Sequence, residues 1–343
     1  MTNTSPGRAA TIEDVAREAG VSRAAVSKVI RNAYGVSPAM RERVTAAIDK
    51  LQYRPRHAAR AMRGSSFTLG IEIPEFGNQF FTRVLTGATR ALEGTGYQLI
   101  IAPAEPGSKW GYRALESLTD HQVDGIIAIS PLVEPAWLER LATAIPVVML
   151  GRHDEGAGYD TVTGDDRAGT DAVMDHLIEL GHRRIAHLTI AESMIDPSLA
   201  SPHAIRLATY LDRMTAAGLT EHAQVARVGA DDDAHAAALD LLGGRDRPTA
   251  VFVGNDQPAL GVLRARMELG LTAQDVSIAG YDDIELAAHP AISLTTVDQD
   301  GERMGERAIE LLLERIKDGR SAPERYSVTP RLRVRGSTAP PRA

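Results

Sequence analysis

The residues of this chain that could take part in chemistry are basic, and they gather near its beginning. Residues 1–65 contain 12 Lys and Arg against 5 Asp and Glu, whereas the remaining residues contain 26 against 40. The two parts therefore carry +7 and −14, which add to the net charge of −7. A basic segment on an acidic body is expected when only one part of a protein meets the phosphates of nucleic acid. We therefore expect a nucleic-acid partner at this end of the chain.

Signatures of catalysis and of metal binding are missing from the sequence. There is no cysteine, which excludes disulfides, thiolate metal sites and thiol nucleophiles. We find no glycine-rich phosphate loop, no nucleophile elbow and no pair of metal ligands at helical spacing. His182 and His187 flank two arginines in a predicted turn, where a capping or solvated role is expected. The sequence thus predicts neither an enzyme nor a cofactor.

Targeting and membrane segments are not expected either. The first ten residues hold no apolar run, and no apolar run reaches the roughly 18 residues that a membrane helix needs. We therefore expect a soluble, cytoplasmic protein without a membrane partner.

The stretch Thr11–Asn32 must position the basic groups. Thr11 and Asp14 have the spacing of a capping box at the start of one helix, and Gly20 suits the left-handed end of that helix. Ser22 can cap a second helix. One face of this second helix carries side chains that are either short or basic, namely Arg23, Ala24, Ser27, Lys28 and Arg31. Two capped helices with an exposed basic second helix predict a helix-turn-helix that fits a DNA major groove, the alternative being a helical hairpin with a solvated face.

A third helix and a basic linker follow. Ser37 and Pro38 suit the start of a helix, and that helix ends before Pro55. The Ala- and Arg-rich segment Arg56–Arg63 is too short to be a stable helix alone in water, so a plain basic linker is one interpretation. We predict a DNA-binding domain over residues 1–54 and a linker over residues 55–66.

From Phe67 onward short apolar runs alternate with amphipathic helices. The predicted strands are Leu69–Ile73, Gln98–Ala102, Gly125–Ile129, Val147–Leu150, Ile185–Ile190, Ala250–Val253, Val276–Ala279 and Leu294–Val297. Continuous apolar strands alternating with helices are typical of parallel sheets in α/β proteins. The pattern predicts two doubly wound lobes over residues 67–336, with a ligand bound between them outside the carboxyl ends of the strands. Residues 337–343 are predicted to form a disordered tail.

Eight segments in order resemble one protein family. They are TIEDVAREAGVSRAAVSKVIRN, VSPAMRERVTAAIDKLQYRPRHAARAM, TLGIEIPEFGNQFF, DDRAG, HLIELGHRRIAHL, FVGNDQPALGVL, VSIAGYDDIELA and LTTVDQDGERMG. With this order and spacing the chain resembles the lac repressor family of bacterial transcription regulators from Thr11 to about Gly336. The resemblance implies an all-α helix-turn-helix head and a core whose two parallel-sheet lobes are of the periplasmic-binding-protein type.

The resemblance also implies roles in DNA binding. Arg23 and Ala24 match the main base-reading pair of the family, with Ser27 and Lys28 behind them, and Arg31 would hold a phosphate or a base. The candidates for phosphate anchors are Thr11, Ser22 and Ser37. The segment Arg56–Arg63 matches a hinge helix that orders on DNA, with Met62 as an apolar wedge in the minor groove flanked by Ala59 and Arg60. The alternative for Met62 is simple packing of the linker.

A second set of implied roles concerns a small-molecule effector. The residues that match cleft positions of the family are Phe76, Asn78, Phe80, Arg206, Asn255, Asp256, Asp282 and Gln299. For each of them a helix cap or a loop anchor is the alternative, and either Asn255 or Asp256 is expected to cap a helix. Gly151, Gly164 and Gly301 replace larger residues of some members. This predicts a roomier pocket, or one organised around Phe76, Trp110 or Tyr281.

The combined prediction is a transcription regulator, expected to be a repressor. It would bind a palindromic double-stranded operator in the nucleoid as a homodimer, under allosteric control by a sugar-like molecule bound between the lobes. One alternative is a cytoplasmic small-molecule-binding protein related to the solute-binding proteins of transport systems. Another is a DNA-packaging protein without sequence preference.

Overall fold

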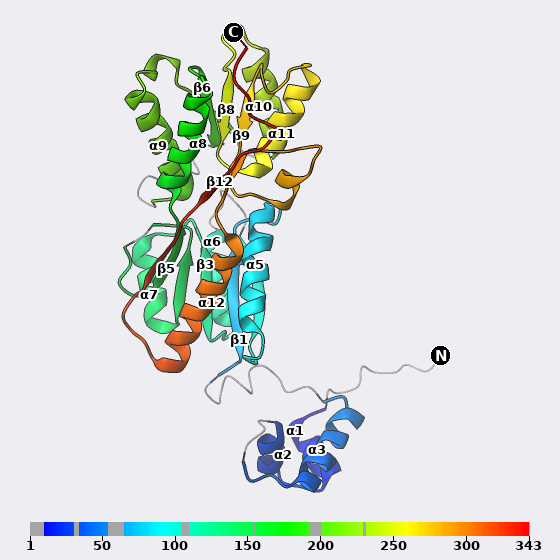
Figure 1. Ribbon diagram of the computed structural model, residues 1–343. Coiled ribbons are helices and arrows are strands. Elements are labelled where there is room, and N and C mark those ends of the chain that lie inside the picture. The colour runs from blue at the N-terminus through cyan, green and yellow to red at the C-terminus, as the bar shows by residue number, and fades with distance from the viewer. Residues whose placement is uncertain are drawn as a thin grey trace. The chain divides into compact units, whose positions relative to one another are not determined.

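A computed structural model describes residues 10–30, 34–53, 65–104, 110–153, 155–191, 200–228 and 231–342 (Figure 1). The chain divides into two compact units, residues 1–66 and residues 67–343. We refer to them as the head and the core.

The described part of the head contains three helices, which begin and end at local signals. They are α1 (Ile12–Ala19), α2 (Arg23–Ile30) and α3 (Pro38–Lys50). The predicted capping box is confirmed, since the Asp14 amide donates to Thr11 Oγ1 at 3.3 Å and the Thr11 amide donates to Asp14 Oδ2 at 2.9 Å. Gly20 ends α1 with φ of 63°, a left-handed conformation that glycine adopts without strain. Val15, Val26 and Val44, one from each helix, are fully buried and form the centre of the head.

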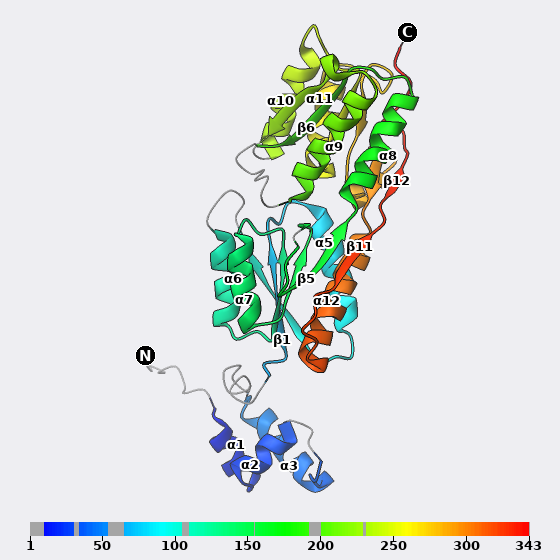
Figure 2. The same ribbon diagram turned by 90° about the vertical axis from the view of Figure 1, so that its left-hand side faces the viewer.

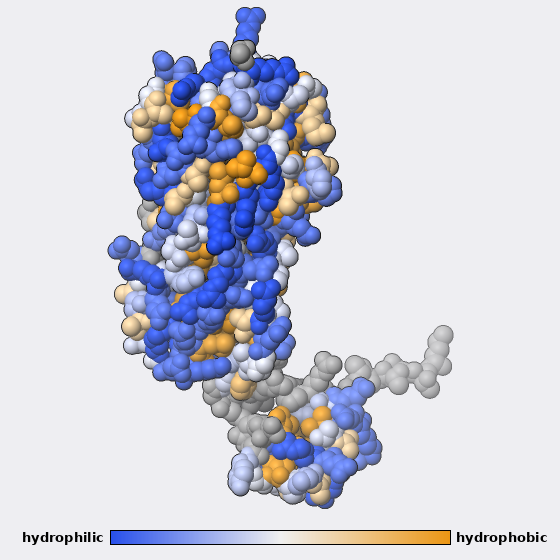
Figure 3. All heavy atoms as spheres, in the orientation of Figure 1, coloured by the Kyte–Doolittle hydropathy of each residue, from blue (hydrophilic) through white to orange (hydrophobic). Residues whose placement is uncertain are grey.

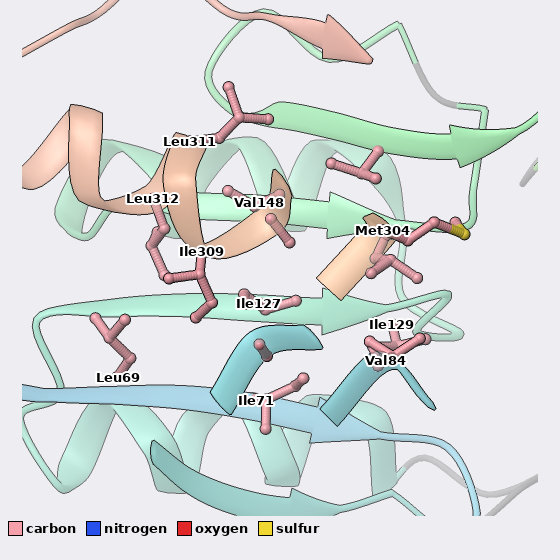
Figure 4. Packing of buried hydrophobic residues seen from close by; sticks show 14 of the residues in the cluster. Leu69, Ile71, Val84, Ile127, Ile129, Val148, Met304, Ile309, Leu311 and Leu312 are labelled. Atoms are coloured by element: carbon pink, nitrogen blue, oxygen red, sulfur yellow. The ribbon is translucent and has the colours of Figure 1, made fainter. Parts of the chain in front are cut away.

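The first lobe of the core is a six-stranded parallel sheet in the order β11-β5-β4-β3-β1-β2. Its strands are β1 (Thr68–Ile73), β2 (Gln98–Pro103), β3 (Gly125–Ile129), β4 (Val147–Leu150), β5 (Asp160–Gly164) and β11 (Arg325–Val328). Helices α5 (Gln79–Leu92) and α12 (Gly301–Asp318) cover one face, and α6 (Trp110–Asp120) and α7 (Pro135–Ala144) cover the other. Figure 4 shows Ile309 and Leu312 of α12 packed among side chains of the strands.

The second lobe is a four-stranded parallel sheet in the order β7-β6-β8-β9. Its strands are β6 (Ile185–Ile190), β7 (Gln224–Val228), β8 (Ala250–Val253) and β9 (Ser277–Ala279). Helices α8 (Asp166–Glu179) and α9 (Pro202–Ala216) cover one face, and α10 (Asp231–Gly243) and α11 (Asp256–Glu268) cover the other. Two short 3-10 helices, Thr220–His222 and Glu285–Ala288, lie in loops.

The described chain passes between the lobes at three places (Figure 2). It leaves the first lobe between β5 and α8, returns between β10 (Thr296–Asp298) and α12, and leaves again between β11 and β12 (Arg331–Arg333). Because α12 follows the second lobe in sequence yet packs in the first, neither lobe is a continuous stretch of chain.

The strand predictions depart from the structure in two ways. The segment Leu294–Val297 was expected in a parallel sheet, but β10 pairs antiparallel with β12 in a separate two-stranded sheet, and Thr295 makes only an isolated parallel bridge to Ala279. The sequence pattern also misses β5, β7, β11 and β12. These strands are short and carry many polar or charged residues, so they lack the continuous apolar run that marks a strand buried on both faces.

The prediction of a disordered tail from residue 337 is also wrong. Ser337 is 1% exposed, and its carbonyl oxygen accepts from the Ile278 amide at 3.0 Å beside the edge strand β9. The Ala339 carbonyl oxygen lies 3.1 Å from Nε2 of His182, which is buried rather than solvated. Residues 336–342 stay ordered because their backbone satisfies polar groups of the second lobe, which composition cannot reveal.

His187 likewise departs from the sequence expectation. Its ring is buried in β6 and stacks on Phe252 with 4.6 Å between ring centroids. Burial, opposed by a hydrogen bond to the Phe252 carbonyl, lowers the pKa of His187 to about 4. It is therefore a neutral core residue.

Asp160 is a buried charge that holds the first lobe together. Its carboxylate accepts from Nη2 of Arg315 at 2.8 Å, from Nη2 of Arg320 at 2.7 Å and from the Glu324 amide at 2.8 Å. Burial alone would raise the pKa of Asp160, but these hydrogen bonds outweigh burial and hold the pKa below its usual range. The carboxylate thereby joins β5 to the end of α12 and to the chain that enters β11.

We predict that Asp160→Asn lowers the free energy of unfolding by about 3 kcal/mol, because it leaves two partly buried guanidinium groups without their counter-charge. Urea unfolding followed by circular dichroism measures the loss. The control Asp240→Asn, at an exposed position of α10, should change the value by less than about 0.5 kcal/mol. Equal stabilities of the two variants would contradict the prediction.

Candidate ligand cavity and nucleic-acid interface

A cavity of about 610 Å³ lies between the two lobes of the core. Its wall includes the last residues of strands from both sheets, namely Ile129, Leu150, Gly164, Ile190 and Val228. Parallel strands place their carboxyl ends at one edge of a sheet, and loops and helix starts with polar groups follow from that edge. The predicted position of a ligand site between the lobes therefore coincides with a real cavity of the size that small-molecule sites have.

Six of the eight predicted effector residues line this cavity. They are Asn78, Phe80, Arg206, Asn255, Asp282 and Gln299. They come from the first lobe, the second lobe and a crossover between them, so only the tertiary fold brings them together.

Arg206, near the start of α9, is held by four groups. Its Nε donates to Asp166 Oδ1 at 2.8 Å, and its Nη1 donates to the Gly254 carbonyl oxygen at 2.7 Å. Its Nη2 donates to Gln299 Oε1 at 3.3 Å, and its guanidinium carbon lies 3.7 Å from the ring centroid of Tyr281. With 4% exposure and every nitrogen engaged, Arg206 is rigid before any ligand binds.

Asp166 supplies the counter-charge of Arg206. Its other carboxylate oxygen lies 2.8 Å from His153 Nε2. Burial would raise the pKa of Asp166, but Arg206 and His153 outweigh burial and hold the pKa below its usual range. The pair is therefore ionised, and its net charge is close to zero.

Asp282 faces the cavity with a strained backbone. Its φ of 124° lies in the left-handed region, and such strain is concentrated at functional sites. Gln299 Nε2 donates to its Oδ1 at 2.5 Å, and Asn78 Nδ2 donates to its Oδ2 at 3.5 Å. Burial, opposed by Arg206, raises the pKa of Asp282 to about 8. The hydrogen bond from Asn78 also links the two lobes across the cavity.

Two predicted effector residues do not line the cavity. Phe76 is 71% exposed and lies outside the cavity wall. Asp256 is buried, and its oxygens accept from Thr296 Oγ1 at 2.6 Å and from the Ile284 amide at 3.0 Å. Asp256 therefore anchors loops of the second lobe, whereas its neighbour Asn255 makes no side-chain capping bond and lines the cavity.

The predictions about pocket size and aromatic residues have a mixed outcome. Gly151 and Gly164 line the cavity, but Gly301 packs against Phe80, whose Cε2 lies 2.9 Å from where a Cβ at residue 301 would stand. Tyr281 is buried behind Arg206 and is absent from the cavity wall. The side chain of Trp110 lies outside the part of the chain that is described.

Sequence reasoning missed two buried polar residues of the cavity wall, Glu72 and His203. Oε2 of Glu72 accepts from the Ile129 amide at 2.9 Å, and burial raises the pKa of Glu72 to about 8. Burial, with the nearby Arg206 charge, lowers the pKa of His203 to about 3, so its ring is neutral. The available signal was Glu72 itself, a charged residue inside the apolar run of a strand buried on both faces.

The head presents the predicted reading helix, with one correction. Arg23, Ala24 and Lys28 of α2 are exposed, as predicted for residues that contact DNA bases. Ser27 is only 8% exposed, because it lies beside the Val26–Val29 stripe that packs into the head and its side chain is short. Ser27 is therefore part of the packed side of α2.

The predicted phosphate anchors cap helices. Ser22 and Ser37 accept at Oγ from the amides of Ala25 and Met40, and both side chains are exposed at helix starts. Thr11 Oγ1 also donates to Asp14 Oδ2 at 2.7 Å, so its hydroxyl hydrogen is already used. The predictions for Arg31, Ala59, Arg60 and Met62 fall outside the described residues.

No helix of the described residues is long and apolar enough to cross a membrane, and hydrophilic residues predominate on the core face shown in Figure 3. Among the same residues, no group of three or more His, Asp or Glu could hold a metal ion.

Comparison with known proteins gives two family matches. Residues 11–56 match the model of bacterial regulatory proteins of the lacI family, and residues 174–338 match a periplasmic binding protein-like domain. The ribose operon repressor of Escherichia coli (strain K12) is 34% identical over 335 residues, covering 96% of this chain and 99% of that repressor.

Solved structures agree over the whole length. The lac repressor dimer bound to operator and the anti-inducer ONPF has a TM-score of 0.81 at 27% identity, covering 97% of this chain and all of that chain. The complex of the transcriptional regulator CelR with cellobiose has a TM-score of 0.68 at 30% identity, covering 96% of this chain and 99% of that one.

The raised pKa of Glu72 predicts a pH effect on the ligand-free protein. Between its ordinary pKa of 4.5 and its folded pKa of about 8, the folded state holds a proton that the unfolded chain releases. Stability should therefore fall as pH rises from 5 to 8, with Glu72 contributing up to about 1.4 kcal/mol per pH unit.

Urea unfolding of the wild type and of Glu72→Gln at pH 5.5, 7.0 and 8.0 measures this effect. The variant lacks the titrating group, so its stability should depend less steeply on pH. Identical pH slopes in the two proteins would show that Glu72 titrates normally.

Proposed function

Because this chain belongs to the lacI family of bacterial regulatory proteins, we propose that it is a repressor of transcription that binds a palindromic operator as a homodimer. Its head supports this function by exposing Arg23, Ala24 and Lys28 on a capped second helix. The lac repressor is a dimer on its operator, and a protein dimer with two-fold symmetry requires a site with matching symmetry. The chain would act in the cytoplasm, on operator DNA of the nucleoid.

The observation that carries the control mechanism is the cavity between the lobes. Its wall combines an immobilised arginine with carboxyl and amide groups, which suit the hydroxyls of a sugar. CelR binds cellobiose, and another lacI-family regulator, from Enterococcus faecium, binds ribose. We infer that the effector is a mono- or disaccharide-sized molecule with several hydroxyls, and that the cavity binds this molecule without transforming it.

Effector binding would act through the two lobes together. Asn78 of the first lobe contacts Asp282 of the second, and three crossovers connect the lobes. A ligand that replaces or reinforces such contacts changes the relative angle of the lobes and thereby the affinity for DNA. By linkage, the DNA complex must then bind that ligand with an affinity changed by the same factor.

The linker would complete DNA recognition. We retain Met62 as an apolar wedge in the minor groove, with Ala59 and Arg60 beside it and Arg31 on a phosphate or base. This part of the proposal rests on the family resemblance of the segment.

Selection of random duplex DNA by the purified protein tests the DNA-binding function. We expect enrichment of a palindrome, and release from that palindrome by a sugar in a gel-shift titration. Retained binding without any enriched motif, with and without sugars, would instead identify a DNA-binding protein without sequence preference.

Arg23→Ala should relax base preference at one position of each half-site by about 1–3 kcal/mol, because Arg23 begins the exposed reading face. Repeating the selection with the variant measures this change. Arg140→Ala, on the exposed face of α7, is the control and should keep the wild-type motif. An unchanged motif for Arg23→Ala would remove Arg23 from base reading.

Asn255→Ala should weaken the response to the effector while leaving operator affinity and stability unchanged. The Asn255 amide lines the cavity without capping its helix, so its loss costs a ligand contact of about 1–2 kcal/mol, or about 5–30-fold in effector concentration. Operator release by the effector is measured with Gln274→Ala, at an exposed loop position, as the control. An unaltered response would place Asn255 outside the binding site.

A further inference from the structure

Among the described residues that line the cavity, carboxyl groups are frequent and free positive charge is scarce. Its charged lining residues are Glu72, Glu75, Asp166, Asp282 and Arg206. The single guanidinium among them is compensated by Asp166, and His203 is neutral. The side chains that remain to meet a ligand are therefore mostly acceptors or acids.

Glu72 differs from the other carboxyls because one of its oxygens has no partner. The side chain is 0% exposed, and Oε2 accepts from the Ile129 amide. Oε1 is buried and makes no hydrogen bond with any part of the chain that the structure describes. A buried polar atom without a partner is destabilising, so its presence at a cavity wall indicates that a ligand supplies the missing group.

Two other buried carboxylates of the core, one in each lobe, have complete hydrogen bonding. Both oxygens of Asp160 accept hydrogen bonds from arginines, and both oxygens of Asp256 are likewise engaged. These residues are buried away from the cavity wall. Asp166 and Asp282 do line the cavity, and both oxygens of each are also bonded, so the unpaired oxygen sets Glu72 apart from them.

We propose that Glu72 selects the ligand at the first-lobe end of the cavity: its Oε1 accepts a hydrogen bond from a hydroxyl or amino group of the ligand, and a wall whose described residues offer no free positive charge excludes phosphorylated and carboxylated ligands. This inference rests on the proposed function, in which the cavity binds the effector. Hydroxyl and amino groups share the chemistry that matters here, a donor hydrogen directed at a carboxyl oxygen.

An anionic ligand finds no free counter-charge among the described residues of the cavity wall. Arg206 is nearly fully buried, each of its three nitrogens donates to Asp166, Gly254 or Gln299, and its charge is balanced by Asp166. A phosphate or carboxylate would therefore lose its hydration in a site of low dielectric constant without gaining a cation to compensate its charge, which is costly. A neutral or cationic ligand instead completes the hydrogen bonding of Glu72.

The first experiment measures the thermal stability of the ligand-free protein. Thermal unfolding is compared for the wild type, Glu72→Leu, Glu72→Met and Glu93→Gln, the last being a control at an exposed position after α5. Since an apolar side chain of similar size removes the unsatisfied oxygen, at least one of the two apolar variants should unfold at a higher temperature than the wild type. Lower unfolding temperatures for both would show that the fold itself uses the carboxyl, which would overturn the proposal.

The second experiment measures binding by calorimetry with D-ribose, D-ribose 5-phosphate, D-glucose, D-glucosamine and cellobiose. We expect a phosphate ester to bind at least about tenfold more weakly than its parent sugar, and Glu72→Met to lose at least about tenfold in affinity for the probe that binds, with Glu93→Gln unchanged. The glucose and glucosamine pair distinguishes a hydroxyl from an amino donor. Equal or tighter binding of the phosphate, or unchanged affinity in Glu72→Met, would overturn the proposal.

The two experiments distinguish a failure of this inference from a failure of the proposed function. If none of the sugars binds the wild type, and none releases the wild type from its operator, the proposed sugar class of the effector is wrong. The inference about Glu72 is then still decided by the stability of the two apolar variants.

Discussion

The buried ion pair between Arg206 and Asp166 is the interaction on which the cavity depends. It joins the starts of α8 and α9, and through Arg206 it also reaches the end of β8 and the crossover at Gln299. Burying a single charge here would be very costly, and each partner offsets the desolvation cost of the other through their attraction. Because the opposite charges of Arg206 and Asp166 cancel, the pair fixes the positions of polar groups in the cavity wall without offering a net charge to a ligand. The remaining acids, Glu72 and Asp282, then decide which ligands are compatible.

Discontinuous lobes explain how such a site can control a distant activity. The helix α12 closes the first lobe after the chain has built the second, and residues of both lobes meet at the cavity. Arg83 of α5 donates to the Asp283 carbonyl oxygen at 2.9 Å and to Asp298 Oδ1 at 3.3 Å, so the lobes are also joined beside the cavity. A ligand that binds between the lobes competes or cooperates with these contacts. Binding energy can thereby be converted into a change of lobe angle, as allosteric coupling requires.

The uneven distribution of charge along the chain matches the different partners proposed for the head and the core. The head carries the basic excess and the exposed Arg23 and Lys28, while the core is acidic overall. An acidic core discourages DNA from binding outside the head, and it also suits a ligand without negative charge. The same composition thus serves both activities.

The sequence by itself determined the features that depend on near neighbours. The capping box of Thr11 and Asp14, the left-handed turn at Gly20 and the buried valines of the head all follow from spacings of three or four residues. The strands of both parallel sheets were visible wherever a continuous apolar run exists, and the family resemblance placed Arg206 and five further residues at the cavity.

Only the tertiary structure decided which side chains face the cavity and which support it. It turned Phe76 outward, placed Asp256 behind the wall, buried Ser27, ordered the tail at Ser337 and left one buried oxygen of Glu72, a residue of the cavity wall, without a partner among the described residues. The physical reason is that burial and hydrogen-bond satisfaction at these residues depend on segments far away in sequence, and spacing within one element carries no information about them.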